Sequence, residues 1–485
     1  MNNTKTMVAK SLYFLIGKRH KYSCRKSFAR KRVFDLAEIN NKTNLKHVGD
    51  NAIIKRVICD SRKVQKGDLF VALKGNSVDA SRFVPEAFAA GAAAAMVCSK
   101  QLIKCSGPLL LVNDDTRLGF GRLASWWRKN FDIPLVAITG SNGKTTVKEM
   151  VSTVLRDYVG DDGVLATEGN LNNDIGVPMT LVRLRPHHKY AVIEMGMNNK
   201  GEIGYLSKMA SPTHGLINNA GAAHVGRLGT IEDVAKAKGE LIDGLTDNGE
   251  VVLNMDDLYF KLWEKKSEDK RVTSFGLTKH ADVTATYKME SSFSQILVNA
   301  FDEKFQINLK IPGVHNVRNA IAASAICSLL GVPGKNISGG LEKFKSINGR
   351  LRKIKLQKNI FLFDDSYNAN PDSVKAAIEV LASLMGRKIF IMGEMGELGA
   401  RAEVFHKNIG GFAKEKGIDR LIGVGALAEF AAEEFGNGGM HYKTKHALLK
   451  DIGNKLGENC NILIKGSRSA GLDEVVTEII NLCEN

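Results

Sequence analysis

Short runs of apolar residues that end in polar ones recur through the middle of the chain. Leu135–Thr139 is a run rich in β-branched side chains, and similar runs occupy Tyr190–Gly196 and His214–Gly221. The first run leads through a glycine-rich turn into Thr145–Tyr158, which we predict to be a helix. Strands that alternate with helices in this way predict a parallel sheet with helices on its faces.

The pattern is different on both sides of this section. From Phe34 to about Asn113 it predicts short strands, turns and one alanine-rich helix, VPEAFAAGAAAAMV. Polar and apolar residues alternate through Ala281–Pro312, which predicts antiparallel strands, and HNVRNAIAASAICSLLG predicts a helix that Gly331 and Pro333 end. Further apolar runs predict a second parallel sheet near the C-terminus: IFLFDDSYN, KIFIMGEMGE, DRLIGVG and NILIKGS.

These changes predict an α/β protein of three domains that follow an N-terminal extension. We place a basic extension at residues 1–33, a small α/β domain at 34–113, a central domain at 114–331 and a C-terminal domain at 332–485. A chain of 485 residues is long enough to bury a core in each domain.

The net charge of +16 is concentrated in the extension, which has about ten Lys or Arg residues and no Asp or Glu. The remaining chain is only mildly basic and has no aromatic and basic stripe, so it suits a small anionic substrate better than a nucleic acid. No apolar run approaches the roughly 18 residues that a membrane-spanning helix needs. The seven cysteines are scattered without a Cys-x-x-Cys pair, which indicates free thiols in a reducing compartment.

The extension allows two interpretations. Its basic, serine-containing and acid-free composition is typical of an organelle transit peptide. A disordered tail, or a start codon assigned too far upstream, would account for it equally well. Cytoplasmic location of the enzyme and targeting to an organelle or endosymbiont by residues 1–33 therefore both remain open.

The turn after the first central strand carries the clearest chemical signal. The segment Gly140-Ser141-Asn142-Gly143-Lys144-Thr145-Thr146 joins a predicted strand to a predicted helix. Glycines let backbone N–H groups turn toward an anion, and the helix N-terminus adds a positive dipole. Lys144 would supply a charge for the β- and γ-phosphates, and the Thr145 hydroxyl could bind Mg²⁺. Ile138 stands where the usual pattern has its first glycine, so this is a variant phosphate loop.

Two further polar side chains follow neighbouring strands of the same predicted sheet. Glu194 ends one strand and His224 comes after the next. The carboxyl ends of parallel strands meet at one edge of a sheet, where ligands bind. One carboxylate, one imidazole and the Thr145 hydroxyl predict a site for a hard cation there.

Several long motifs together resemble the ATP-dependent Mur ligases. They are TGSNGKTT, EGNLNNDIGVP, EMGMNNKGEI, NNAGAAHVGRLGTIEDVAKAKGE, PGVHNVRNA, NGRL and DDSYNANPDS, and they run in order from about Phe34 to the C-terminus. The resemblance implies a UDP-substrate-binding domain, a central P-loop ATPase-like domain and a C-terminal Rossmann-like domain. It also implies a ligase that joins D-alanyl-D-alanine to UDP-N-acetylmuramoyl-tripeptide in peptidoglycan synthesis, through an acyl phosphate on the tripeptide.

The resemblance also implies roles for individual residues at the ATP site. Lys144, Thr145, Glu194 and His224 keep the roles given above, with two magnesium ions. A lysine is carbamylated by CO₂ in related ligases, and the carbamate helps to hold a magnesium; here we favour Lys238, with Lys236 as the alternative. Contacts to the nucleotide are implied for His315, Asn316, Asn319, Arg350 and Asp365. Arg350 would reach the γ-phosphate from the C-terminal domain, so that catalysis depends on domain closure.

The nucleotide-sugar substrate has its own implied contacts. Ser61, Arg62 and Lys74 resemble the residues that bind the uridine diphosphate, and Asn170, Asn172 and Asn173 resemble those that bind the muramoyl part. Tyr367, Asn368 and Asn370 shape the loop after a C-terminal strand. Asparagine-rich loops and Asn-Pro pairs are also ordinary turns, so a purely structural interpretation stays open for these residues.

Other functions agree less well with these motifs. One alternative is another amino acid ligase of the same superfamily, such as a diaminopimelate- or lysine-adding Mur ligase. The diaminopimelate-adding enzymes carry an Asp-Asn-Pro-Arg motif, which is absent here, whereas DDSYNANPDS is present. A folylpolyglutamate synthase-like ligase would lack the N-terminal domain, and a GTPase would need Asn-Lys-x-Asp. A non-catalytic ATP-binding protein would not need to keep Lys144, Glu194, His224 and Arg350. We expect a monomer that does not span a membrane or bind nucleic acid.

Overall fold

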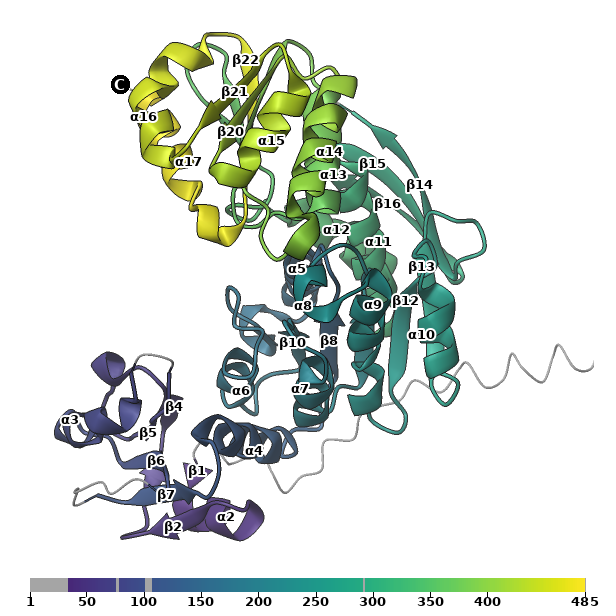
Figure 1. Ribbon diagram of the computed structural model, residues 1–485. Helices are drawn as coiled ribbons and strands as arrows, with labels where there is room; N and C mark the ends of the chain where they lie inside the picture. Colours follow the sequence, from purple (N-terminus) through teal and green to yellow (C-terminus); the bar gives the residue numbers. More distant parts are fainter. Residues whose placement is uncertain (1–33, 76–77, 101–106, 291–292, 485) are drawn as a thin grey trace, which may run out of the picture.

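Three α/β lobes follow one another along the chain in the computed structural model (Figure 1). The structure describes residues 34–484, apart from 76–77, 101–106 and 291–292. The predictions for the basic extension therefore lie outside the described residues. Within the described ranges, no helix has the length and apolar character needed to cross a membrane.

The N-terminal lobe is a five-stranded sheet in the order β2-β7-β6-β5-β4. Strands β4 to β7 are parallel, and β2 runs antiparallel to β7. A separate antiparallel pair, β1 and β3, lies beside it. The elements are β1 (Phe34–Asp35), α2 (Leu36–Lys42), β2 (Lys46–Val48), β3 (Ile53–Ile54), β4 (Arg56–Ile58), η1 (Ser61–Lys63), β5 (Asp68–Val71), η2 (Ala80–Phe83), α3 (Val84–Ala89), β6 (Ala94–Cys98) and β7 (Leu109–Val112).

The predicted alanine-rich helix of this lobe is wrong in its second half. Helix α3 ends at Ala89, and the last two alanines of the run, Ala94 and Ala95, begin β6, a buried strand in the middle of the sheet. Gly91 has φ +99°, a conformation that ends the helix and that alanine would rarely adopt. Burial between two strands then decides the structure of the remaining alanines, against their helix propensity.

The central lobe contains a nine-stranded sheet in the order β16-β15-β14-β13-β12-β11-β8-β10-β9. Neighbours from β9 to β14 are parallel, and β14, β15 and β16 form the predicted antiparallel section. The strands are β8 (Leu135–Thr139), β9 (Val164–Ala166), β10 (Tyr190–Glu194), β11 (His214–Ile217), β12 (Glu250–Asn254), β13 (Arg271–Gly276), β14 (Val283–Met289), β15 (Ser294–Ala300) and β16 (Glu303–Leu309).

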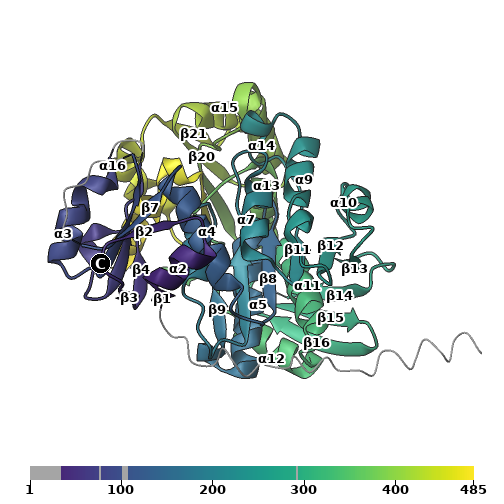
Figure 2. The same ribbon diagram turned by 90° about the horizontal axis from the view of Figure 1, so that it is seen from below.

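Helices cover both faces of this sheet, because successive residues of its buried strands are apolar and point to opposite faces, as in β8. Val136 and Ile138 pack with α5, α11 and α12, whereas Leu135 and Ala137 pack with α4, α6, α7 and α9 (Figure 2). The helices are α4 (Thr116–Arg128), α5 (Lys144–Val159), η3 (Asp161–Gly163), α6 (Gly176–Leu181), α7 (Glu202–Ala210), α8 (Val225–Leu228), α9 (Ile231–Gly239), η4 (Ile242–Gly244), α10 (Phe260–Lys266), α11 (Val314–Leu329) and α12 (Gly334–Lys343).

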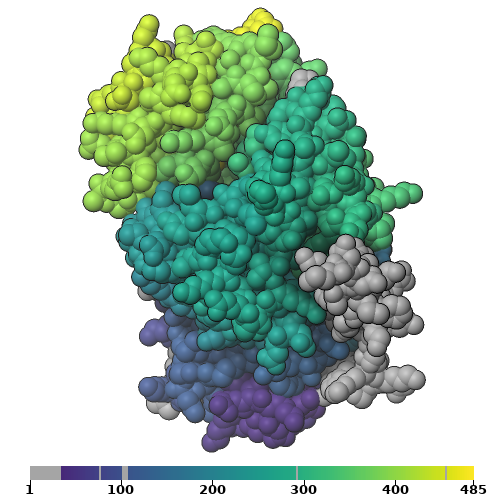
Figure 3. All heavy atoms as spheres, turned by 90° about the vertical axis from the view of Figure 1, so that its right-hand side faces the viewer, coloured from purple at the N-terminus to yellow at the C-terminus, as the bar shows by residue number. Residues whose placement is uncertain are grey.

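The C-terminal lobe is a six-stranded sheet in the order β17-β18-β22-β19-β20-β21. All neighbours are parallel except β17 and β18. The lobe rests directly on the central one (Figure 3). Its elements are β17 (Arg352–Lys355), β18 (Phe361–Asp365), α13 (Pro371–Ala382), β19 (Arg387–Gly393), η5 (Gly399–Arg401), α14 (Ala402–Glu415), β20 (Arg420–Val424), α15 (Ala426–Phe435), β21 (Gly439–Tyr442), α16 (Lys445–Leu456), β22 (Cys460–Lys465), η6 (Arg468–Ala470) and α17 (Asp473–Glu484).

This order of strands positions the site. Strands β8, β10 and β11 are adjacent in the central sheet, so the loops after them share one edge. Residues that follow β18 and β19 of the C-terminal sheet contact those same loops, as described below. The described cysteines, Cys59, Cys98, Cys327, Cys460 and Cys483, are all free thiols.

Candidate active site

The glycine-rich loop after β8 is fixed by polar contacts from the next strand. Helix α5 begins at Lys144, directly after Gly143, which has φ +79°. The Asn142 N–H donates to Asn219 Oδ1 at 2.8 Å, and Asn218 Nδ2 donates to the Asn142 carbonyl at 2.9 Å. A Cβ on Gly143 would stand 2.4 Å from Asn319 Oδ1. Both this close approach and the positive φ require glycine at this position. The strand, loop and helix predicted for phosphate binding are therefore present.

Lys144 lies over the loop with its charge poorly solvated. Its Nζ donates to the Gly140 carbonyl at 2.6 Å and to the Ser141 carbonyl at 3.3 Å. Burial lowers the pKa of Lys144, the nearby Glu194 carboxylate opposes that shift, and Arg350 adds to it. A bound phosphate would reverse this balance, because an anion beside the amine favours its charged form.

Glu194 joins the phosphate loop to the asparagine loop. Its Oε1 accepts a hydrogen bond from Thr145 Oγ1 at 3.2 Å and another from Asn172 Nδ2 at 2.7 Å. The side chain is 1% exposed, and Oε2 is buried with no hydrogen-bond partner among the described residues. A buried, unpartnered carboxylate oxygen beside a threonine hydroxyl fits a hard cation such as Mg²⁺.

The side chains predicted to bind the cation do not form a complete set of metal ligands in this structure. No three His, Cys, Asp or Glu side chains in the described chain lie close enough together to hold a metal ion. His224, the predicted imidazole ligand, has its Nδ1 2.5 Å from Glu397 Oε2 of the C-terminal lobe. Glu194 and Thr145 are therefore the two predicted ligands that the structure brings into direct contact.

Two lysines of α9 that are only two residues apart differ in burial and in the direction of their pKa shifts. Lys238 is 2% exposed, and its pKa is lowered well below the usual value by burial and by the neighbouring Lys144. Lys236 forms an exposed ion pair with Glu232 at 2.7 Å, which raises its pKa. Carbamylation requires a neutral amine, so the environment of Lys238 suits that reaction and the environment of Lys236 does not.

A buried lysine that the sequence analysis missed ties α5 to the asparagine loop. Lys148 is fully buried, and its Nζ donates to Glu149 Oε1 at 2.5 Å and to the Thr167 carbonyl at 2.9 Å. The Thr167 hydroxyl in turn accepts a hydrogen bond from the Glu194 N–H at 2.9 Å. Lys148 therefore holds together the helix of the phosphate loop and the strand end that carries Glu194. The only indication of this role in the sequence was a charged residue at a position of the predicted helix that is buried in the structure.

The three residues predicted on the nucleotide side begin helix α11. Asn319 Oδ1 accepts from Asn218 Nδ2 at 3.1 Å, and Asn316 Nδ2 donates to the Pro312 carbonyl at 2.7 Å. The bond between Asn319 and Asn218 attaches α11 to the strand end beside the phosphate loop, and the Asn316 bond fixes the start of the helix. Burial lowers the pKa of His315 to about 4, with further contributions from Lys465 and Arg318, so its imidazole is neutral at pH 7.

The residues predicted in the C-terminal lobe converge on the phosphate loop. A cavity of about 50 Å³ is lined by Ser141–Thr146 on one side and by Arg350, Asn368–Asn370 and Ser373 on the other. The Arg350 guanidinium lies 4.3 Å from the centre of the Tyr367 ring. Asn370 Nδ2 donates to Asn142 Oδ1 at 2.8 Å, and Asn142 Nδ2 donates back at 3.3 Å. The C-terminal lobe is thus already in contact with the loop.

Asp365 is part of a buried ion pair. Its Oδ2 lies 2.7 Å from Lys465 Nζ, which also donates to the Asn368 carbonyl at 2.8 Å. Burial raises the pKa of Asp365, and the Lys465 charge opposes that shift. The pair fixes the strand ends of β18 and β22 behind the Arg350 loop.

The residues predicted for the nucleotide sugar lie in two places, the N-terminal lobe and the asparagine loop beside Glu194. Ser61 and Arg62 form η1, and Lys74 follows β5, all in the purple N-terminal lobe of Figure 1. The Arg62 side chain is exposed and pairs with Asp60 at 2.9 Å. Asn172 contacts Glu194, whereas Asn173 caps α6 by accepting from the Gly176 N–H at 2.9 Å, and Asn170 is exposed. The structure does not bring the N-terminal residues into contact with the phosphate loop.

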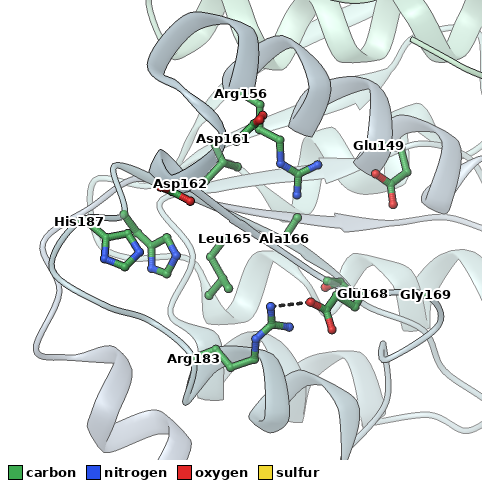
Figure 4. A pocket seen from close by; sticks show the side chains of 13 residues that line it. Glu149, Arg156, Asp161, Asp162, Leu165, Ala166, Glu168, Gly169, Arg183 and His187 are labelled. Atoms are coloured by element: carbon green, nitrogen blue, oxygen red, sulfur yellow. Dashed lines mark hydrogen bonds and ion pairs between the residues drawn. The ribbon is translucent and has the colours of Figure 1, made fainter. Parts of the chain in front are cut away.

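A second cavity, of about 360 Å³, lies beside the edge strand β9 (Figure 4). It is lined by side chains of both charges, and Arg183 Nη2 contacts Glu168 Oε1 across it at 2.6 Å. Burial, together with the neighbouring His187 and two arginines, lowers the pKa of His188 to about 4. None of the predicted site residues lines this cavity.

Three family descriptions match the chain in order. "Mur ligase family, catalytic domain" matches residues 53–118, "Mur ligase middle domain" matches 138–327, and "Mur ligase, glutamate ligase domain" matches 349–468. These ranges contain most of the motifs quoted above.

Individual proteins match over nearly the whole chain. The UDP-N-acetylmuramoyl-tripeptide--D-alanyl-D-alanine ligase of Escherichia coli (strain K12) is 40% identical over 445 residues, which are 91% of this chain and 97% of the relative. A crystal structure of MurF from Acinetobacter baumannii has a TM-score of 0.86 at 32% identity and covers 93% of this chain and 99% of its own. MurF ligase from Thermotoga maritima in complex with ADP has a TM-score of 0.77 at 25% identity, covering 88% and 97%.

Proposed function

This chain belongs to the Mur ligase family, and from that premise we propose that it joins D-alanyl-D-alanine to UDP-N-acetylmuramoyl-tripeptide with ATP as the energy source. The reaction forms a C–N bond in a peptidoglycan precursor. The arrangement around Glu194 carries this proposal. A phosphate loop, an unpartnered buried carboxylate oxygen and an arginine from a second lobe meet at one edge of the central sheet.

The chemistry explains why ATP is required. A carboxylate does not acylate an amine, because it is anionic and its oxygen is a poor leaving group. Attack of a tripeptide carboxylate oxygen on the γ-phosphorus gives an acyl phosphate and ADP. The dipeptide amine then adds to the acyl carbon, and the tetrahedral intermediate collapses to the amide, releasing phosphate and a proton.

The residues of this chain divide this work. Backbone N–H groups of residues 143–146 and the ammonium of Lys144 hold the phosphates, while the Ser141 and Asn142 N–H groups are bonded to Asn219. Arg350 approaches the same loop from the C-terminal lobe and neutralises charge on the transferred phosphoryl group. Asn316 and Asn319 position the nucleotide base, and Asp365 stands on the ribose side. Asn170, Asn172 and Asn173 position the muramoyl part, with the uridine diphosphate at Ser61, Arg62 and Lys74.

We propose magnesium at Thr145 and Glu194, with His224 and a carbamate on Lys238 as further ligands. Magnesium bound there would neutralise phosphate charge and polarise the γ-phosphoryl group. The lowered pKa of Lys238 supports the carbamate, because it keeps the amine neutral and able to react with CO₂. Lys236 is charged and paired on the outside of the same helix.

Where and in what state the enzyme acts are also proposals. The cytoplasm is the compartment that supplies ATP and nucleotide-linked sugars and keeps the described cysteines reduced. A monomer is sufficient, since a single chain provides all the proposed site residues. Residues 34–113, 114–331 and 332–485 would then be the substrate, ATP-binding and closing domains.

Phosphate release from ATP tests the function. The wild-type chain should release phosphate at a sustained rate only when UDP-N-acetylmuramoyl-tripeptide and D-alanyl-D-alanine are both present. D-glutamate or lysine in place of the dipeptide, and a folate in place of the nucleotide sugar, should not support release. Sustained release with either replacement, or none with the proposed pair, would exclude this assignment.

A further inference from the structure

A loop of the C-terminal sheet reaches the predicted cation ligand of the central sheet. Glu397 lies after β19, and its Oε2 stands 2.5 Å from His224 Nδ1. Its backbone carbonyl accepts a hydrogen bond from the Gly226 N–H at 2.9 Å. A Cβ on Gly226 would stand 2.8 Å from both Glu397 O and Gly399 N, so the two backbones approach as closely as glycine allows.

Both partners of this contact have an unusual backbone conformation. Glu397 and His224 each have φ +62°, in the left-handed region that residues other than glycine seldom adopt. Such a conformation is strained and persists where the surroundings impose it, often at functional sites. Here two such residues face each other across the junction of two lobes.

The Glu397 loop is held rigidly by its own lobe. The Met395 N–H donates to His406 Nε2 at 2.9 Å, and His406 Nδ1 lies 2.7 Å from the Ala402 carbonyl, so the buried imidazole is fixed at both nitrogens. The Ser467 N–H donates to the Glu394 carbonyl at 2.8 Å. The position of the Glu397 carboxylate therefore follows the position of the whole C-terminal lobe.

We propose that Glu397 is a positioning residue that orients the His224 ring for the cation when the C-terminal lobe closes. Metal-binding histidines commonly donate their second ring N–H to a carboxylate, which fixes the tautomer and the ring orientation. In this structure Glu397 Oε2 is at ion-pair distance from His224 Nδ1 without hydrogen-bond geometry. A carboxylate that accepts from Nδ1 would leave Nε2 as the ring atom for the cation. Domain closure and cation binding would then be coupled, because the orienting carboxylate belongs to the moving lobe. This inference rests on the proposed function of the same site.

The same junction provides a matched control. Asp372 of α13 also reaches across it, accepting a hydrogen bond from the Ala222 N–H at 3.1 Å. The structure has no hydrogen bond or ion pair between Asp372 and His224, so the loss of the Asp372 carboxylate weakens the contact between the lobes without changing the His224 ring partner. Comparing Glu397→Gln with Asp372→Asn separates orientation of His224 from simple attachment of the lobes.

The test measures binding of Mn²⁺, as a probe for Mg²⁺, to the full chain with a non-hydrolysable ATP analogue. Electron paramagnetic resonance reports free Mn²⁺, and small-angle scattering of the same samples reports domain closure. Glu397→Gln should weaken Mn²⁺ binding about tenfold, whereas Asp372→Asn should change it less than about twofold. Equal losses in both variants, or no loss in Glu397→Gln, would overturn the proposal.

A second variant covers the case in which Glu397→Gln folds poorly, as judged by its melting curve. Glu397→Asp keeps the charge and tolerates a positive φ, but its carboxylate is one methylene shorter. Mn²⁺ affinity should fall between those of the wild type and of Glu397→Gln, and wild-type affinity would contradict the proposal. Because no peptide substrate is present, this result does not depend on which acid the enzyme phosphorylates; the phosphate-release assay decides that separately.

Discussion

The central and C-terminal edges of the active site both carry buried lysines, but the partners of those lysines differ. Lys144 and Lys238 lie near each other on the central edge, and burial lowers the pKa of both. Lys465 on the C-terminal edge is 2% exposed, like Lys238, but pairs with Asp365 at 2.7 Å, whereas Lys144 is only partly buried. Neither Lys144 nor Lys238 forms an ion pair with a described residue, although the Glu194 carboxylate lies near Lys144, whereas the pair on the C-terminal edge is neutral as a whole.

This difference separates the roles of the two lobes. The central edge gains most from binding phosphates, because an anion beside Lys144 favours the charged form of its amine. A carbamate on Lys238 would replace the other amine with a negative charge. On the C-terminal edge, Lys465 and Asp365 already neutralise each other, so bound anions would stabilise this edge little. The edge can instead close over the site as a rigid surface. It still presents Arg350 and Glu397 to the central loops. Closure would therefore add one positive and one negative side chain to the phosphate loop and the cation ligands of the central lobe.

The largest effect should come from Lys144. Lys144→Ala removes the ammonium nearest to the phosphate loop and should lower kcat/KM for phosphate release about 10³-fold, or about 4 kcal/mol. The measurement is steady-state phosphate release with both substrates. Lys208→Ala, at an exposed position on α7, is the control and should behave as wild type. Turnover of Lys144→Ala within tenfold of wild type would remove the contrast between the two edges.

Breaking the pair on the C-terminal edge should act on stability. Lys465→Met leaves Asp365 buried without a cation and should destabilise the C-terminal lobe by about 3 kcal/mol. Hydrogen exchange of peptides that cover β18 and β22 measures this locally. The double variant Lys465→Met/Asp365→Asn should recover much of the loss, because no uncompensated charge remains. Unchanged exchange in the single variant would show that the pair is not what neutralises this edge.

The two lysines of α9 provide a sharper comparison within the central edge. Lys238→Ala should lower kcat about 100-fold if a carbamate orders the site, and a short carboxylic acid added at millimolar concentration should restore part of the activity. Lys236→Ala should stay within about twofold of wild type, since an exposed ion pair contributes little. Equal loss in both variants, or no rescue of Lys238→Ala, would argue against the carbamate.

A smaller effect should appear as a pH dependence of stability. His315 has a pKa of about 4 in the folded chain because of burial, and about 6.5 when unfolded, so the unfolded state binds more protons between these values. Stability should therefore fall as the pH is lowered from 7 to 5. His315→Gln should reduce that loss by about 1–2 kcal/mol, as measured by thermal melting at both pH values. His280→Gln, at an exposed position, should keep the wild-type slope.

Local patterns were sufficient to predict most of the fold. Strand β8 occupies the predicted Leu135–Thr139, and α5 exceeds its prediction by one residue at each end, because buried strands and helix starts leave strong local signals. The alanine run before Cys98 was mispredicted because alanine fits a helix and a tightly packed strand equally well. Only the neighbouring strands β5 and β7 decide between them.

The candidate site was predictable where one motif carries it and not where two lobes meet. The loop from Gly140 to Thr146 is contiguous, so its chemistry is visible in the sequence. Glu397 and Asp372 reach loops that lie about 150 or more residues away, and no spacing rule connects such positions. The burial that distinguishes Lys238 from Lys236 likewise depends on packing that residue type alone does not reveal.

The central claim is that the terminal phosphoryl group of ATP is transferred to the tripeptide carboxylate before the amide forms. Tripeptide nucleotide labelled with ¹⁸O in that carboxylate tests it directly, because the oxygen that attacks phosphorus leaves with the phosphate. Mass spectrometry of the released phosphate should find one ¹⁸O atom per turnover. Phosphate without ¹⁸O, at a normal rate of product formation, would show that the carboxylate is not phosphorylated before the amide forms.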